Sequence, residues 1–375
     1  MTSHGSLLLT EEQEDFRRTV RRLMADLSPE STVREQITDR EGFDQNTWRR
    51  LAELGMLGIA VPEQFGGAGY GPVEAGLFAA EAGRVLLVSP YFSSVILAAN
   101  TFAAAGVDKV CASTLAGICG GRTTATLAVL DRTGAWGPGH TNVTAARLNH
   151  GWNLSGSASF VPDVMTADVL LVPGRMDDGL GLFLVDSHAD GVLRSSMETV
   201  DMTRKLGHLC LDGTVGQLLS NRPEAESLLE HVLDLALVQI AAEQAAGTRR
   251  VLELAVEHAK VRRQFGRPIG SFQAVKHLCA DMLIQAEQAD AAAAAAAATA
   301  AVGGQDLSVV ASIAAVCCSE AFLTVAENAI EVFGGIGFTW EHPAHLYYRR
   351  ALADHALLGT PTWHRERIAA LRGFA

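Results

Sequence analysis

The character of the sequence changes twice along its 375 residues. Up to about Gly120, apolar residues recur at helical spacing. From Thr123 to about Leu219, short apolar runs are separated by Gly, Asp, Asn and Pro, which is typical of strands and turns. The helical pattern returns at Glu224 and continues from there. This order predicts a helical domain at residues 1–121, a β domain at 122–223 and a helical bundle at 224–375.

Local patterns strengthen the helical prediction at both ends of the chain. Thr10 and Gln13 are spaced as a capping box, in which each side chain binds the backbone N–H of the other residue. The stretch from Val232 to Arg263 is longer than an average helix and therefore suggests a bundle. Eight consecutive alanines, Ala291 to Ala298, indicate a helix that packs closely against its neighbours.

The composition narrows the classes of function. A net charge of −12 argues against nucleic acid as the main partner. The six cysteines are scattered, with Cys317 next to Cys318, and this spacing fits neither a metal site nor a disulfide framework. No apolar run approaches the ~18–20 residues of a membrane span, and Met1–Thr10 has no basic region before its leucines. We therefore expect a cytoplasmic enzyme, or a subunit of one, without a membrane span.

Three segments carry recognisable motifs. Residues Leu54–Gly58 (LGMLG) lead to Pro62–Gly67 (PEQFGG) in the first domain. The last domain contains Arg262–Gln273 (RRQFGRPIGSFQ) and, further on, Glu331–Phe338 (EVFGGIGF). In this order, and in register with the change from helices to strands and back, the segments resemble the acyl-CoA dehydrogenase family. The resemblance extends over almost the whole chain.

The resemblance implies a fold, a cofactor and a reaction. The implied fold is α+β, with an N-terminal helical domain, a middle β-barrel or β-sandwich domain and a C-terminal four-helix bundle, assembled as dimers or tetramers. FAD would lie between the β domain and the bundle, and its ADP half would reach a neighbouring subunit. The implied reaction is α,β-dehydrogenation of an acyl-CoA thioester. A carboxylate takes the α-proton, flavin N5 takes the β-hydrogen as hydride, and the electrons leave to an electron-transfer flavoprotein or similar acceptor.

The resemblance assigns the following residues to cofactor binding: Arg262, Phe265, Gln273, Glu331, Gly334, Gly335 and, in the β domain, Phe160. The guanidinium of Arg262 offers a planar donor fork for a pyrophosphate, or it is a solvated helix end. The Gly334-Gly335 pair lets a phosphate or a second backbone approach, or it simply ends a helix. Phe265 and Phe272 cover an adenine or pack. Glu331 stands where the family has Gln.

The chain departs from the family at the catalytic base. The usual base is the Glu of an E-G-T sequence, and here Leu358 precedes Gly359-Thr360. Some members carry the base on the first bundle helix, and that position is Ala236. Glu243 is the nearest carboxylate, two helical turns or about 10–11 Å further along the same face. It is a candidate base, and a structural polar contact is the alternative.

The β domain departs from the family as well. The family usually has a Trp followed two residues later by a Thr or Ser whose hydroxyl meets the flavin near N5. Here Phe160 can still stack on the ring, but Pro162 has neither a hydroxyl nor an N–H. The acidic, Pro- and Gly-rich loop of the family appears only as residues 130–134 (LDRTG). The residues expected to hold this subunit's own flavin ring are thus eroded, whereas those expected to reach a neighbour's ADP half are largely kept.

Three functions remain open at this point. The chain is an acyl-CoA dehydrogenase whose base lies elsewhere, or a catalytically silent partner that lends FAD contacts to a related, Glu-bearing subunit of a hetero-oligomer. In either case we expect a homo- or hetero-oligomer with a related subunit. The third alternative is a flavin monooxygenase or oxidase on the same fold, for which nothing in the sequence marks an oxygen site. The missing base and Pro162 favour the second on physical grounds, and we interpret the chain as a dehydrogenase, alone or within a complex.

Overall fold

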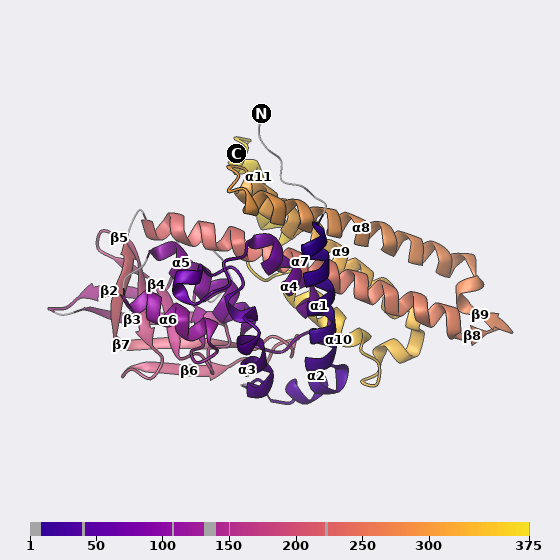
Figure 1. Ribbon diagram of the computed structural model, residues 1–375, viewed down its shortest axis with the longest axis horizontal. Helices are drawn as coiled ribbons and strands as arrows, with labels where there is room; N and C mark the ends of the chain where they lie inside the picture. Colours follow the sequence, from indigo (N-terminus) through magenta and orange to yellow (C-terminus); the bar gives the residue numbers. More distant parts are fainter. Residues whose placement is uncertain are drawn as a thin grey trace. The chain divides into compact units, whose positions relative to one another are not determined.

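The computed structural model describes residues 9–39, 42–106, 109–130, 140–149, 151–221 and 224–374. Its elements follow the predicted order of helices, then strands, then helices, which confirms the α+β class (Figure 1). By the contacts between residues, the chain forms two compact units. Unit 1 takes the described residues within Met1–Arg34, Pro72–Leu87 and Leu237–Ala375, and unit 2 takes those within Glu35–Gly71 and Val88–Ala236. The three predicted domain boundaries stay a prediction, and residues 222–223 lie outside the described residues.

The N-terminal elements are helical. They are α1 (Glu11–Leu27), α2 (Glu30–Gln36), α3 (Gln45–Glu53), the 3-10 turns η1 (Met56–Gly58) and η2 (Glu63–Phe65), α4 (Pro72–Arg84), η3 (Phe92–Ala99), α5 (Asn100–Ala105) and α6 (Lys109–Cys119). The predicted capping box is present at α1. The Gln13 N–H donates to Thr10 Oγ1 at 3.2 Å, and the Thr10 N–H donates to Gln13 Oε1 at 3.0 Å.

Unit 2 is built around a seven-stranded sheet. Its strands are β1 (Ala125–Leu127), β2 (Thr144–Arg147), β3 (Trp152–Pro162), β4 (Val169–Met176), β5 (Gly179–Asp186), β6 (Val192–Ser196) and β7 (Leu206–Asn221). Strands β4, β2, β3, β7 and β5 pair in turn, and β5 pairs back with β4, so these pairings close a small barrel. Strand β1 extends β4 in parallel, and β6 lies antiparallel on β7.

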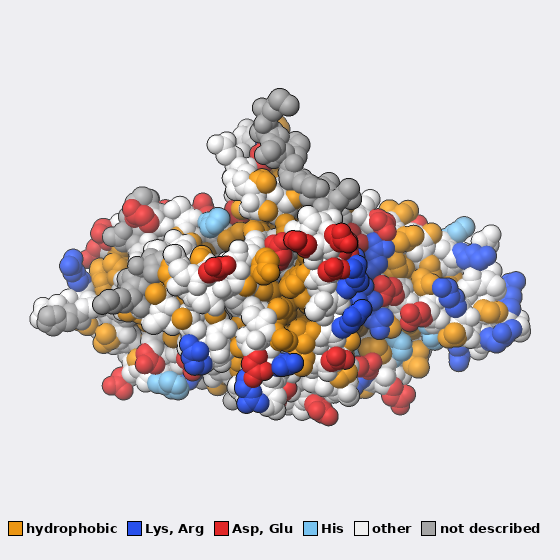
Figure 2. All heavy atoms as spheres, viewed as in Figure 1, with side chains coloured by type: hydrophobic (Ala, Val, Ile, Leu, Met, Phe, Trp, Pro, Cys, Tyr) orange, Lys and Arg blue, Asp and Glu red, His pale blue; other side chains and the backbone are white. Residues whose placement is uncertain are grey.

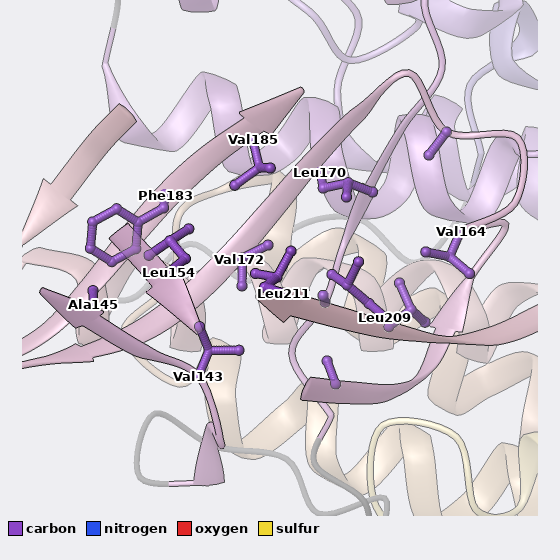
Figure 3. Close-up of a cluster of buried hydrophobic side chains, with 14 residues drawn as sticks. Val143, Ala145, Leu154, Val164, Leu170, Val172, Phe183, Val185, Leu209 and Leu211 are labelled. Atoms are coloured by element: carbon purple, nitrogen blue, oxygen red, sulfur yellow. The ribbon is translucent and has the colours of Figure 1, made fainter. Parts of the chain in front are cut away.

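The barrel interior is filled by alternate side chains of its strands (Figure 3). Leu154, Val172 and Phe183 are fully buried there. Trp152 meets the edge of the Phe183 ring with centroids 5.6 Å apart. A Cβ added to Gly181 would lie 2.8 Å from that ring, so a glycine is required where the phenyl group crosses the strand. Truncation of such a buried Phe to Ala typically costs about 3–5 kcal/mol.

The segment η3 is a π-helix whose eight residues are all buried in unit 2. Ser94 ties it to β1, because its Oγ both donates to the Ala125 carbonyl and accepts from the Ala125 N–H, each at 3.0 Å. Ser93 Oγ donates to a carboxylate oxygen of Asp163 at 2.6 Å. The bond between Ser93 and Asp163 fixes the chain immediately after β3. Short π-helical segments often occur at functional sites.

Unit 1 contains the predicted helical bundle. Its C-terminal elements are α7 (Glu224–Val261, in unit 1 from Leu237 on), the strands β8 (Arg263–Gln264) and β9 (Arg267–Pro268), η5 (Ile269–Ser271), α8 (Gln273–Ala301), α9 (Leu307–Phe333), η6 (Gly334–Phe338), α10 (Ala344–Asp354) and α11 (Pro361–Leu371). Helix α9 packs against α8, α10 and α11. The alanine run lies in α8 as predicted, and its buried members Ala293, Ala296 and Ala298 allow the close packing that the sequence suggested.

Helix α9 with its extension η6 is long and apolar enough to cross a membrane by length and composition alone. However, 61% of its most apolar stretch is buried inside the protein, as in the core helix of a bundle. The absence of a membrane span therefore stays a prediction.

Candidate functional site

A short hairpin follows α7 and carries the Arg262 segment (Figure 1). Strands β8 and β9 are joined by Phe265 and Gly266, whose φ angles of 53° and 76° are both left-handed, as a two-residue type I′ turn requires. Phe265 at the tip is 91% exposed. Its ring meets the edge of Phe272 at 6.1 Å, and the guanidinium of Arg267 lies 4.1 Å above Phe272. The ring at the tip of the hairpin is therefore accessible to another molecule.

The hairpin is strongly basic (Figure 2). Arg262, Arg263 and Arg267 are all exposed along it. Within the described part of the chain, no salt bridge engages Arg262. The backbone fixes its position, because its N–H donates to the His258 carbonyl and its carbonyl accepts from the Ile269 N–H, both at 2.8 Å. An arginine whose backbone is fixed by hydrogen bonds and whose guanidinium is exposed is well placed for a bidentate hydrogen bond to a phosphate.

The end of α9 lies beside the end of α7. The His258 ring of α7 meets the edge of the Phe333 ring of α9 at 5.3 Å. Gly334 follows Phe333 directly. Its φ of 64° and ψ of −142° form a backbone conformation that essentially only glycine adopts. No atom lies within 4 Å of a Cβ added to Gly334 or Gly335, so the backbone here is open to a ligand. We call this place, formed by His258, Arg262 and the Gly334-Gly335 turn, the phosphate corner.

The other predicted cofactor residues of unit 1 lie near its surface. Gln273 is the first residue of α8 and its side chain is exposed. Glu331 is exposed on the last turn of α9, where its carbonyl accepts the Gly334 N–H. The exposed guanidinium of Arg262, the open Gly334-Gly335 turn and the exposed ring of Phe265 are what a pyrophosphate joined to a planar base requires, so they fit the ADP half of FAD.

Glu243 lies inside unit 1. Its side chain is 10% exposed and forms a salt bridge with Arg350 of α10, whose side chain is 4% exposed. Gly83 of α4 lies against it, and a Cβ added there would be 2.6 Å from the Glu243 carbonyl oxygen. A buried carboxylate with its own guanidinium is a structural contact, so the geometry supports that alternative over a role as base.

Both expected base positions are hydrocarbon and buried. Leu358 is 1% exposed and adopts a left-handed φ of 58°. Thr360 then caps α11, accepting the Trp363 N–H at 3.2 Å. Ala236 on α7 is fully buried. Neither side chain accepts a proton.

Phe160 is presented by an irregularity in the barrel of unit 2. The register between β3 and β7 shifts between Ala158 and Val161, and Phe160 takes a left-handed φ of 55° there. Its neighbour Ser159 is hydrogen-bonded to His208 Nδ1 at 3.0 Å. Such a strained, half-buried aromatic residue is consistent with a stacking platform.

Pro162 is buried in the same segment, and its carbonyl accepts a hydrogen bond from Thr126 Oγ1 at 2.7 Å. It therefore supplies no donor to a ligand. Of the loop at 130–134, residues 131–134 lie outside the described residues.

Two residues of the candidate site were not predicted from the sequence: Arg350, which pairs with Glu243, and His258 of the phosphate corner. Arg350 was missed because its pairing with Glu243 joins residues 107 positions apart, which no local pattern reveals. His258 carried a usable signal, because it precedes Arg262 by four residues and so shares its helix face.

Two family models match the chain. The model described as acyl-CoA dehydrogenase, N-terminal domain, matches residues 10–122, and the one described as acyl-CoA dehydrogenase, C-terminal domain, matches residues 228–371. Among curated relatives, acyl-CoA dehydrogenase FadE27 of Mycobacterium tuberculosis is 31% identical over 333 residues, 87% of each chain. Acyl-CoA dehydrogenase FadE34 of the same organism is 37% identical over 97% of this chain, which spans 48%, about half, of the length of that relative.

Two solved structures are similar to the chain over nearly its whole length. A chain of the ChsE4–ChsE5 complex from Mycobacterium tuberculosis superposes with a TM-score of 0.90 at 29% identity, covering 99% of both chains. A chain of a variant of the Tcur3481–Tcur3483 steroid ACAD superposes with a TM-score of 0.88 at 31% identity, covering 97% of this chain and 98% of that one.

Proposed function

Because the chain belongs to the acyl-CoA dehydrogenase family, whose members are FAD-dependent oxidoreductases, we propose that it is a partner subunit in the α,β-dehydrogenation of an acyl-CoA thioester. In this role it contributes contacts to the ADP half of FAD, and a related chain supplies the carboxylate base. Electrons leave to an electron-transfer flavoprotein or a similar acceptor, and the assembly is cytoplasmic.

One observation carries the proposal. The two positions where the family places its base are the buried hydrocarbons Leu358 and Ala236, and the nearby Glu243 is already paired with Arg350. At the same time the phosphate corner is exposed and intact. The chain has thus lost a group needed to remove the α-proton and has kept groups that bind the cofactor.

The residues of unit 1 have distinct roles in this proposal. Arg262 binds the pyrophosphate with two parallel N–H donors. Gly334 and Gly335 let the phosphate oxygens approach the backbone, since a side chain there would stand in the way. Phe265 and Phe272 offer faces on which the adenine stacks. FAD, when bound, is the hydride acceptor of the reaction.

The partner is a related chain rather than a second copy. A homo-oligomer would repeat Pro162 and Leu358 in every flavin-ring pocket, so no pocket would have a base. Two relatives support a hetero-oligomer, because the similar solved structures are the ChsE4–ChsE5 complex and the Tcur3481–Tcur3483 steroid ACAD. A chain that carries a Glu at the position of Leu358 would complete the site.

Turnover by the isolated chain tests the proposal. The purified protein is assayed with acyl-CoA substrates of several lengths and an artificial electron acceptor. We expect a rate lower by roughly 10²–10⁴-fold or more than the enzyme reaches with its partner, because no general base is present. A rate on the order of 1–10 s⁻¹ from the chain alone would overturn the proposal and show that another base exists.

A further inference from the structure

His258 lies between the two parts of the phosphate corner. It lies in the last turn of α7, and its carbonyl accepts the N–H of Arg262, the residue directly after that helix, at 2.8 Å. Its ring contacts Phe333, the residue that precedes Gly334. A ligand that bridges Arg262 and the glycine turn therefore passes close to this imidazole.

A second histidine lies at the corner but is committed to the fold. His342 is 4.1 Å from the Phe333 ring and 6.5 Å from the His258 ring, centroid to centroid. Its Nδ1 accepts the N–H of Ala344, the first residue of α10, at 3.2 Å. A proton on Nδ1 would break that bond. In contrast, among the described residues no hydrogen bond occupies either ring nitrogen of His258.

We propose that His258 is a third contact for the FAD pyrophosphate and that it takes up a proton when the pyrophosphate binds. This inference rests on the proposed function, since it takes Arg262 and Gly334 as the pyrophosphate contacts. The bound cofactor is then held more tightly at mildly acidic pH than at alkaline pH.

The charges around His258 explain why the proton arrives with the ligand. Burial lowers the pKa of His258, and the positive charge of Arg262 lowers it further. Burial and His258 likewise lower the pKa of His342, on which Glu30 and Arg34 of α2 act in opposite directions. His258 is therefore neutral near pH 7 while the corner is empty of anions. The negative charge of a bound pyrophosphate raises the pKa of His258 and so favours the imidazolium.

The pH dependence of FAD affinity tests this proposal. FAD binding is measured by equilibrium dialysis and flavin absorbance from about pH 5.5 to about pH 8.5, on the protein together with any subunit that co-purifies. No group of FAD itself titrates near neutrality. The wild-type association constant is expected to rise by up to about tenfold per unit as the pH falls through part of this window. In His258→Gln it is expected to be flat and to equal the wild type at the alkaline end.

His277→Gln is the matched control, because His277 is exposed near the start of α8 and should leave the wild-type slope unchanged. Proton uptake is measured independently by calorimetry of FAD binding in two buffers with different ionisation enthalpies. We expect uptake near pH 7 in the wild type and none in His258→Gln.

The outcomes separate this inference from the proposed function. If Arg262→Ala weakens FAD binding at every pH but His258→Gln keeps the wild-type slope, the role of His258 is wrong and the corner still binds FAD. If Arg262→Ala leaves FAD binding unchanged, the corner is not a pyrophosphate site and the proposed function fails with it.

Discussion

Glu243 and Arg350 form a buried ion pair across α7 and α10, although 107 residues separate them in the sequence. Their side chains are 10% and 4% exposed, so neither charge has water to replace its partner. The pair joins the first long bundle helix to the helix that leads to Leu358. The carboxylate that the sequence offered as a candidate base is thus already held by a cation inside unit 1.

Removal of the cation should therefore be more damaging than removal of both charges. Arg350→Met takes from the buried Glu243 the cation of this salt bridge, and we expect the free energy of unfolding to fall by about 3–5 kcal/mol. The double variant Arg350→Met with Glu243→Gln should recover much of this loss. Urea unfolding measures both. If Glu243 were instead the base, Glu243→Gln would abolish turnover while the unfolding midpoint stayed unchanged.

Two glycines of α4 make a matched pair. A Cβ added to Gly83 would lie 2.6 Å from the Glu243 carbonyl oxygen and 2.9 Å from its Cα, so Gly83→Ala must push α4 away from α7. We expect a loss of about 1–3 kcal/mol. A Cβ added to Gly76 would be 3.8 Å from Ala242, an ordinary contact. Gly76→Ala should therefore be neutral or stabilise by about 0.5–1 kcal/mol through helix propensity. Equal effects in thermal unfolding would contradict this packing.

His364 should make the protein sensitive to acid. It is 1% exposed, and burial, followed by the charge of Arg367, lowers its pKa to about 4. In the unfolded chain a histidine titrates near pH 6.5, to within about a unit. Between these two values the unfolded state binds more protons, so the free energy of unfolding falls as the pH falls.

The expected loss from His364 is about 3 kcal/mol, accumulated from about pH 6.5 down to about pH 4. Urea titrations of the wild type and of His364→Leu at several pH values check this. The stability of the wild type should drop more steeply than that of the variant within this window. Parallel curves would show that the pKa of His364 is not lowered in the folded protein.

The sequence predicted those parts of the fold that depend on local pattern. The capping box of Thr10 and Gln13 and the helix through the alanine run follow from neighbouring residues, and both are confirmed. The closure of the barrel by β4 and β5 with β2, β3 and β7 depends on pairings between distant strands, so periodicity could show only that strands occur. The π-helix η3 has no sequence signature of its own, and its burial comes from tertiary contacts with β1.

The candidate site also has parts that the sequence predicted and parts that depend on contacts between distant residues. The Arg262 segment and the Gly334-Gly335 turn were visible as motifs, and the side-by-side ends of α7 and α9 bring them to one corner through the contact of His258 with Phe333. That contact joins residues far apart in the chain. The role of Phe160 stays a prediction, supported by its strained backbone at the shift of register in β3.

Loss of the Arg262 side chain should weaken FAD binding without unfolding the protein. Arg262→Ala removes a charge-assisted contact worth about 1.5–3 kcal/mol, or roughly 10- to 150-fold in the dissociation constant. Flavin absorbance after dialysis against limiting FAD measures the effect. Lys276→Ala, an exposed cation on α8, is the control and should retain full occupancy. Unchanged occupancy in Arg262→Ala would show that Arg262 is a solvated helix end.

The stoichiometry of flavin in the purified assembly tests the central claim most directly. The chain is co-expressed with the products of neighbouring open reading frames, and the native mass and the FAD content are measured on the same sample. We expect a hetero-oligomer in which a related, Glu-bearing chain is present and one FAD is bound for every two chains. A stable homo-oligomer of this chain that holds one FAD per chain would contradict it.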